Sequence, residues 1–221
     1  MQFAEFKQRA RKPYYTNYMA IVFSRVSVRL SYLFAHTSIT PNQLTLLSTF
    51  VAILGAAMIQ WSTYYVRITG ILIWFLAYVL DFCDGEIARY RDMKTEFGHW
   101  FDVVSDRMKD VALFTAVTLL AVRESQSTIT VLAGLLALGG TMVYAYSVSA
   151  RPSDRLTTQF SPDRFGNVNY AIMAVLVLLN EAELFLYVVV LVTSLGLLFS
   201  IYSTWSKSTL SPIARCQDTS D

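Results

Sequence analysis

The sequence is poor in charged residues, cysteines and histidines, and each shortage excludes a class of protein. Only 15% of the 221 residues are charged while 54% are hydrophobic, a balance that excludes an ordinary soluble domain. The two cysteines, Cys83 and Cys216, are too few for a disulfide framework, and we expect reduced thiols. The two histidines, His36 and His99, lack the partners of a zinc site. No internal repeat, low-complexity segment or cleavable signal-peptide pattern is visible.

Long apolar blocks predict an all-α, polytopic membrane protein. Before the first block, Tyr15 to Thr37 alternates apolar residues with Arg25 and Arg29, which favours an amphipathic helix on the membrane surface over a plain tethering arm. The expected organisation is a juxtamembrane segment (1–40), a transmembrane domain (41–207) and a tail (208–221). We expect six transmembrane helices, at 43–62, 68–90, 98–122, 127–150, 167–181 and 183–206.

Four aspartates lie at the inner ends of two neighbouring apolar runs, where an unpaired charge would cost several kcal/mol. Asp81 and Asp84 are three residues apart, and Asp102 and Asp106 are four apart, so each pair shares one face of a helix. A short connection at about 91–97 would let the two helices face each other as a hairpin. Four carboxylates suit a hard cation, Mg²⁺ or Mn²⁺, better than zinc.

Two further residues beside the aspartates indicate a phosphate ligand. Gly85 has no side chain, so a ligand can approach the backbone there, and Arg89 lies one turn further along, where its planar guanidinium can reach a phosphate. Two simpler interpretations remain open. The aspartates could form buried ion pairs with Arg89, Arg107 and Lys109, or they could serve a proton relay in a transporter.

The distribution of lysine and arginine predicts the orientation. Of the 18 such residues, all except Arg67 and Arg123 fall on the side that holds both termini. Because positively charged loops stay in the cytoplasm, we expect both termini and the aspartates to face the cytoplasm.

The aspartates belong to a longer pattern, which reads Asp81-x2-Asp84-Gly85-x2-Ala88-Arg89-x8-Gly98-x3-Asp102-x3-Asp106. This pattern resembles the signature of the CDP-alcohol phosphotransferase family of membrane enzymes. All eight fixed positions of the family signature are filled at the family's spacing, and a match of that length is specific. The element from Ile39 to Thr45 looks like the Pro-Asn-x-x-Thr element that precedes the family's first membrane helix. The resemblance covers most of the chain.

The resemblance implies a reaction and a set of roles. The family transfers a substituted phosphate group from a CDP-linked alcohol to a second alcohol and releases CMP. By resemblance, Asp106 is the general base. A homodimer is also implied. The implied metal ligands are Asp81, Asp84, Asp102 and Asp106, and the implied nucleotide and diphosphate contacts are Asn42, Thr45, Gly85, Ala88, Arg89 and Gly98.

The substrates are less well defined than the reaction. We expect CDP-diacylglycerol as donor and a polyol phosphate, such as inositol phosphate or glycerol phosphate, as acceptor in phospholipid biosynthesis. Arg151, Arg155 and Arg164 follow the fourth span and could hold an anionic acceptor. The alternatives within the family are transfer from CDP-inositol to inositol phosphate, and transfer of phosphocholine or phosphoethanolamine to diacylglycerol. From another class, a small ion-coupled or proton-coupled transporter is the alternative.

Overall fold

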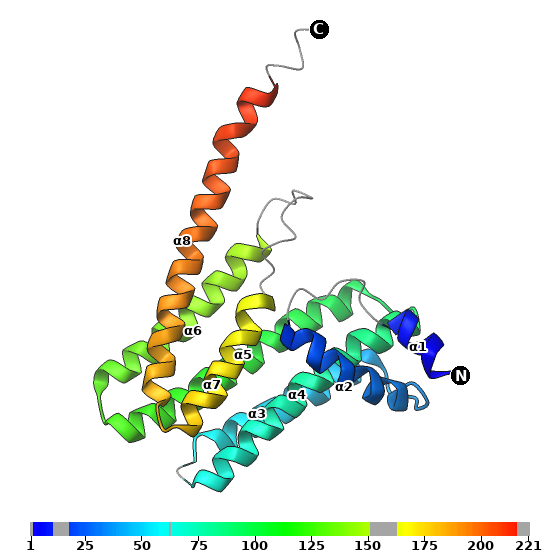
Figure 1. Ribbon diagram of the computed structural model, residues 1–221, viewed down its shortest axis with the longest axis horizontal. Coiled ribbons are helices and arrows are strands. Elements are labelled where there is room, and N and C mark those ends of the chain that lie inside the picture. Colours follow the sequence, from blue (N-terminus) through cyan, green and yellow to red (C-terminus); the bar gives the residue numbers. More distant parts are fainter. Residues whose placement is uncertain (1, 11–17, 62, 151–162, 216–221) are drawn as a thin grey trace.

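The computed structural model describes residues 2–10, 18–61, 63–150 and 163–215 (Figure 1). Within these residues all regular structure is helical, which confirms the predicted all-α class. The helices are α1 (Phe3–Ala10), α2 (Tyr18–Phe34), α3 (Pro41–Ile59), α4 (Tyr64–Tyr90), α5 (Glu96–Ser125), α6 (Thr128–Ser149), α7 (Asp163–Leu178) and α8 (Ala182–Arg215).

Each of the six predicted spans corresponds to a helix, but the helices differ in how well they suit a bilayer. Four of them are long and apolar enough to cross it, namely α3, α4, α6 and the part of α8 from Ala182 to Ser206. In α5 the first turns carry charged residues, and the apolar part of α7 is short, from Asn169 to Leu178. The chain is therefore an integral membrane protein, and the count of six spans stays a prediction.

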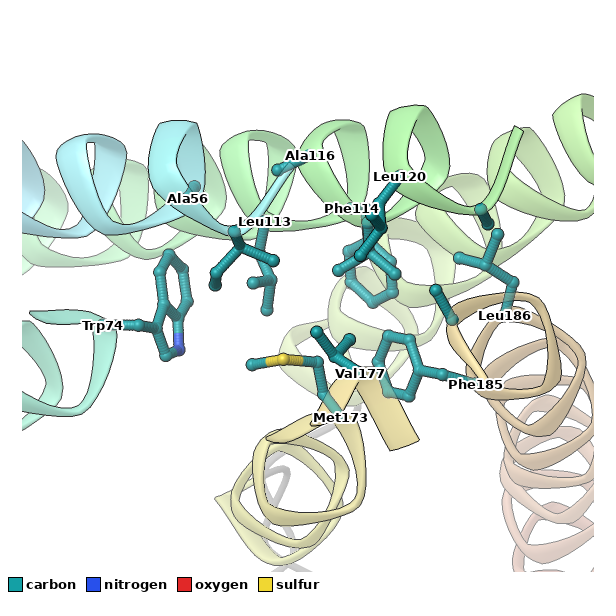
Figure 2. Close-up of a cluster of buried hydrophobic side chains, with 14 of the residues drawn as sticks. Ala56, Trp74, Leu113, Phe114, Ala116, Leu120, Met173, Val177, Phe185 and Leu186 are labelled. Carbon is teal, nitrogen blue, oxygen red and sulfur yellow. The ribbon is translucent and has the colours of Figure 1, made fainter. Parts of the chain in front are cut away.

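The helices pack as two connected groups (Figure 1). α3 lies against α4 and α5, while α6 lies against α8, and α5 also contacts α6 and α8. α5 therefore joins the two groups. Figure 2 shows the buried cluster at this junction, in which Trp74 of α4, Leu113 and Phe114 of α5, Met173 of α7 and Phe185 of α8 point toward one another. Burying these large apolar side chains fixes the position of α5 relative to the other helices.

α3 and α4 form a very close pair, because two glycines let their backbones touch. A Cβ atom added at Gly55 would lie 2.8 Å from the backbone nitrogen of Trp74. One added at Gly70 would lie 2.8 Å from the carbonyl oxygen of Gly55. Real Cβ atoms do not come this close to backbone, so neither position has room for a side chain. Small residues at a crossing are the usual means of close helix packing in membranes.

α2 agrees with the amphipathic helix predicted within Tyr15 to Thr37, but its serines face the protein. The hydroxyls of Ser27 and Ser31 are buried and donate hydrogen bonds of 2.8 and 2.7 Å to the carboxylate of Glu86 on α4. Leu33 is 66% exposed on the outside. The inner face therefore carries the buried serines, while the exposed face carries apolar residues together with Arg25 and Arg29, as in an amphipathic helix at a membrane surface.

α1 was not predicted from the sequence. Phe6 is fully buried, and its ring centroid lies 5.6 Å from that of Tyr32 and 4.8 Å from that of Tyr90. This aromatic contact joins α1 to the ends of α2 and α4. With eight residues, α1 is too short for a clear hydrophobic period, so its partners decide its structure.

Arg67, near the start of α4, is buried at the opposite end of α4 from the aspartates. Its guanidinium donates hydrogen bonds to the carbonyl oxygen of Val177 (3.2 Å), the side-chain oxygen of Asn180 (2.6 Å) and the carboxylate of Glu124 (3.1 Å). These partners come from α5, from α7 and from the turn that follows α7. A buried arginine with this many acceptors joins three segments at one point.

Candidate functional site

Three helix ends meet at the candidate site: the start of α3, the end of α4 and the start of α5. α3 begins with a capping box, in which the Thr40 hydroxyl accepts from the Gln43 amide (3.3 Å) and the Gln43 side chain accepts from the Thr40 amide (2.9 Å). Thr95 is the N-cap of α5, and its hydroxyl accepts from the Gly98 amide at 2.9 Å. These caps fix where the site-bearing helices start.

The structure brings three of the four predicted metal ligands together. Carboxylate oxygens of Asp81 on α4 and of Asp102 and Asp106 on α5 all lie within 4.8 Å of one another. The helical spacing and the short connection between α4 and α5 produce this arrangement, as the sequence predicted for these three residues. We call these three residues the carboxylate cluster.

Asp84 lies beside the carboxylate cluster but is not one of its members. Its carboxylate is buried and accepts a 2.5 Å hydrogen bond from the hydroxyl of Thr45 on α3. Thr45 was predicted as a nucleotide contact, and in the structure it contacts a predicted metal ligand. The hydrogen bond offsets part of the cost of burying a carboxylate.

Lys109 is the cation of the carboxylate cluster. Its ammonium group bonds to Asp81 Oδ1 and lies 3.3 Å from Asp106 Oδ1, and its side chain is only 9% exposed. One of the simpler interpretations of the sequence, ion pairing with Lys109, therefore holds for two aspartates. Arg107 instead pairs with Asp110 at 2.9 Å, outside the cluster.

The charges of the cluster fit a divalent cation. With all groups ionised, three carboxylates and one ammonium carry a net charge of −2, which Lys109 alone does not neutralise. All three carboxylates are hard oxygen donors, which Mg²⁺ and Mn²⁺ prefer. No histidine or cysteine belongs to the group within the residues described here. The predicted cofactor, Mg²⁺ or Mn²⁺, therefore agrees with this donor set.

Two of the predicted nucleotide contacts lie next to each other across α3 and α5. A Cβ atom added at Gly98 would lie 3.2 Å from the side-chain oxygen of Asn42. A side chain at residue 98 would therefore press on Asn42, and the glycine keeps the space between these helices open. Ala88, another predicted contact, is half-buried on α4.

Arg89 is held between its own helix and α1. Its Nε donates a 2.6 Å hydrogen bond to the carbonyl oxygen of Ala10, the last residue of α1. A Cβ atom added at Gly85 would lie 3.2 Å from one terminal nitrogen of Arg89, so the guanidinium lies over the gap that this glycine leaves. Gly85 and Arg89 are thus adjacent in space, as predicted.

Arg151 and Arg155 lie outside the described residues, as does the side chain of Arg164. A cavity of about 80 Å³ lies among α5, α6, α7 and α8, and one of its lining residues, Asp110, is one turn from Asp106. The Tyr170 hydroxyl donates a 2.8 Å hydrogen bond to Asp110 at its wall. Further polar side chains on its lining are Arg107, Thr141, Tyr144, Asn169 and Thr193.

Sequence reasoning missed two polar residues at or near the site. Ser48 lies 3.4 Å from Asp81 Oδ1, and Glu86 accepts hydrogen bonds from the two serines of α2. Lys109, in contrast, was named as a possible ion-pair partner of the aspartates, and it lies three residues after Asp106 on the same helix face. No local signal pointed to Glu86 or Ser48, whose partners come from distant parts of the chain.

The fold and the site define a polytopic helical membrane protein with a carboxylate cluster where three helices meet. The comparison with family models gives its relationship. The CDP-alcohol phosphatidyltransferase model matches residues 38–202, so the chain belongs to this family. The resemblance seen in the motif is thereby confirmed, and the chain is a transferase. Family membership gives no support to the transporter alternative.

Two curated proteins with different names are similar to this chain over stretches of different length. A protein of Aquifex aeolicus named as a bifunctional IPC transferase and DIPP synthase is 29% identical over 196 residues, 83% of this chain and 42% of that protein. The phosphatidylinositol phosphate synthase of Corynebacterium glutamicum is 38% identical over 80 residues, 36% of each chain. The matched stretches therefore span less than half the length of each of these two relatives.

Solved structures show the same fold. Phosphatidylinositol phosphate synthase of Mycobacterium tuberculosis with CDP-DAG bound superposes with a TM-score of 0.66 at 17% identity, over 82% of this chain and 94% of that one. The same enzyme in complex with manganese and citrate gives a TM-score of 0.64 at 17% identity, over 81% and 88%. At this identity the likeness establishes the fold.

Proposed function

We propose that this protein is a metal-dependent enzyme of phospholipid biosynthesis that transfers a substituted phosphate group from a CDP-alcohol to a second alcohol and releases CMP. CDP-diacylglycerol is the proposed donor, and a polyol phosphate such as inositol phosphate or glycerol phosphate is the proposed acceptor. The observation that carries the proposal is the carboxylate cluster of Asp81, Asp102 and Asp106, close to the helix ends where Asn42 meets Gly98. The site is proposed to face the cytoplasm.

Asp106 is the proposed general base. Its side chain is 42% exposed, against 22% for Asp81, so a hydroxyl group reaches it more easily. The Asp106 carboxylate would take the proton of the acceptor hydroxyl while the hydroxyl oxygen attacks the phosphorus distal to cytidine. The bond from that phosphorus to the CMP oxygen breaks, and CMP leaves with the electron pair.

Asp81, Asp84, Asp102 and Asp106 are the proposed ligands of Mg²⁺ or Mn²⁺. A bound divalent cation would supply positive charge to the diphosphate and to the leaving CMP. Thr45 engages Oδ2 of Asp84, and Oδ1 is the atom we propose for the cation. The proposed contacts to nucleotide and diphosphate are Asn42, Thr45, Gly85, Ala88, Arg89 and Gly98.

Two places are proposed for the acceptor. Arg151, Arg155 and Arg164 would hold its phosphate, because arginine binds phosphate oxygens with two parallel hydrogen bonds. The cavity beside Asp110 and Tyr170 would hold its hydroxyl groups, since its wall offers hydroxyl, amide and carboxylate partners. A homodimer is proposed from the family resemblance alone.

A second candidate is transfer from CDP-inositol to inositol phosphate. The similarity to the Aquifex aeolicus protein favours it, since that match covers 83% of this chain. Both candidates use the same cluster and release the same nucleotide. With inositol phosphate as acceptor, they differ only in the alcohol that the donor carries.

CMP release by the purified chain tests both. CDP-diacylglycerol is offered with inositol phosphate, glycerol phosphate, inositol or serine in turn, and CDP-inositol with inositol phosphate, each with Mn²⁺, Mg²⁺ or EDTA. Metal-dependent release that requires CDP-diacylglycerol and a phosphorylated acceptor supports the first proposal. Release only from CDP-inositol favours the second, and release from neither donor contradicts both.

A further inference from the structure

Lys109 occupies a position that is unusual for a lysine. It projects from α5 one turn beyond Asp106, and its ammonium group bonds to Asp81 of α4 and lies 3.3 Å from Asp106. The side chain is 9% exposed, so the charge is largely removed from water. A buried ammonium needs such partners, and the carboxylates need it equally.

The oxygens that hold Lys109 belong to the proposed metal ligands. Lys109 contacts Oδ1 of Asp81 and Oδ1 of Asp106, both members of the carboxylate cluster. Ser48 is also near Asp81 Oδ1, at 3.4 Å. A divalent cation bound by this cluster would therefore lie close to a positive charge that binds to the same groups, and the two cations would repel each other.

We propose that Lys109 is a positioning residue that acts as a built-in counter-ion. It holds Asp81 and Asp106 together when no metal is bound, and it weakens the binding of the divalent cation. The inference rests on the metal site of the proposed function. It has two consequences of opposite sign: removing the charge should strengthen metal binding, and it should destabilise the metal-free protein.

Lys109→Gln tests both consequences, because glutamine can still donate a hydrogen bond but has no charge. Mn²⁺ affinity is measured on the full chain in detergent from the electron paramagnetic resonance signal of free Mn²⁺, and thermal unfolding is measured in EDTA and in Mn²⁺. We expect Lys109→Gln to bind Mn²⁺ at least about tenfold more tightly, as loss of a nearby repulsive charge requires. We also expect a lower unfolding temperature in EDTA, with recovery in Mn²⁺.

Two control variants separate charge from general damage. Lys109→Arg keeps the charge and should leave the Mn²⁺ affinity close to that of the wild type. Lys94→Gln removes an exposed charge from the turn between α4 and α5 and should change neither readout.

The outcomes are distinct. If the wild type binds Mn²⁺ and Lys109→Gln binds it equally or less tightly, the Lys109 inference is overturned while the metal site stands. If neither binds Mn²⁺, both the inference and the metal site fail. If Lys109→Gln folds only when Mn²⁺ is present, the inference is supported, because the metal then replaces the ammonium. If it does not fold even with Mn²⁺, the inference is contradicted.

Discussion

The hydroxyl of Thr45 on α3 donates a 2.5 Å hydrogen bond to the carboxylate of Asp84 on α4, and both residues are buried. The contact joins two motifs that are 39 residues apart in the sequence. A buried carboxylate depends on its donors, because it has lost the hydrogen bonds that water would provide. The Pro-Asn-x-x-Thr element and the aspartate motif thus belong to one site.

Thr45→Val should destabilise the protein and weaken metal-dependent nucleotide binding. Valine keeps the shape of threonine but leaves Asp84 without this donor, at a cost of about 1–3 kcal/mol in the free energy of unfolding. Thermal unfolding and CDP binding with Mn²⁺ measure the effects. Thr49→Val is the matched control, since among the described residues the Thr49 hydroxyl bonds only within its own helix, to the Thr45 carbonyl. Equal behaviour of the two variants would contradict the role of the Asp84 contact.

Asp106→Asn should lower turnover by about 10²- to 10⁴-fold, the usual contribution of a general base. CDP binding with Mn²⁺ should be largely kept, because the other aspartates remain. CMP release and nucleotide binding are measured side by side. Asp92→Asn serves as control: Asp92 is exposed in the turn after α4 and has φ 54°, which asparagine also adopts. Full turnover by the Asp106 variant would remove the general-base assignment.

Replacing Ser27 and Ser31 together by alanine should release α2 from α4. Glu86 is fully buried and would lose two hydrogen-bond donors, for an expected loss of about 2–5 kcal/mol in the free energy of unfolding. Ser24→Ala is the control, because its buried hydroxyl bonds to the Ile21 carbonyl in the same helix. Hydrogen exchange of α2 amides should rise only in the double variant. Unchanged exchange there would show that α2 is held by other contacts.

Gly70→Ala should destabilise the α3–α4 pair by about 1–3 kcal/mol, the usual result of overpacking. The added methyl group would meet the backbone of Gly55 and Ile59 at 2.8 Å. Gly139→Ala on α6 is the opposite case, because nothing lies within 4 Å of its added Cβ atom. That change should be neutral or stabilising by up to about 1 kcal/mol, through helix propensity. The unfolding temperature should fall for Gly70→Ala and should stay the same or rise for Gly139→Ala.

Arg151→Ala combined with Arg155→Ala should raise the KM for an anionic acceptor several-fold and change the KM for the donor little. Loss of two arginines removes charge-assisted hydrogen bonds to a phosphate. Steady-state CMP release at varied acceptor concentration measures the effect. Arg123→Ala, on the opposite side in the predicted topology, is the control. An unaltered acceptor KM would point to a neutral acceptor.

The positions of Asp81, Asp102 and Asp106 could be predicted because local geometry decides them. Helical spacing sets the face on which the α5 pair projects, and the short connection sets the helices side by side. The direction of Asp84 could not be predicted, since it depends on a hydroxyl from another helix. The same holds for Glu86, whose serine partners are 55 and 59 residues away.

The membrane helices were predictable to different degrees for a similar reason. Apolar length alone identifies α3, α4, α6 and α8, whereas α5 starts with the charges of the site. From the sequence, Arg67 could be predicted only to lie on the side of the membrane opposite to the two termini. Its burial among Val177, Asn180 and Glu124 depends on packing between helices.

The backbone contact at Gly55 and Gly70 also determines which parts of the site can change position. Because α3 and α4 touch without intervening side chains, the two helices have little freedom to slide or tilt against each other. Thr45 and Asp84, which lie on these two helices and are joined by a hydrogen bond, are therefore expected to keep their relative position. If the proposed function holds, adjustment to substrates of different size would fall to α5, which carries Asp106.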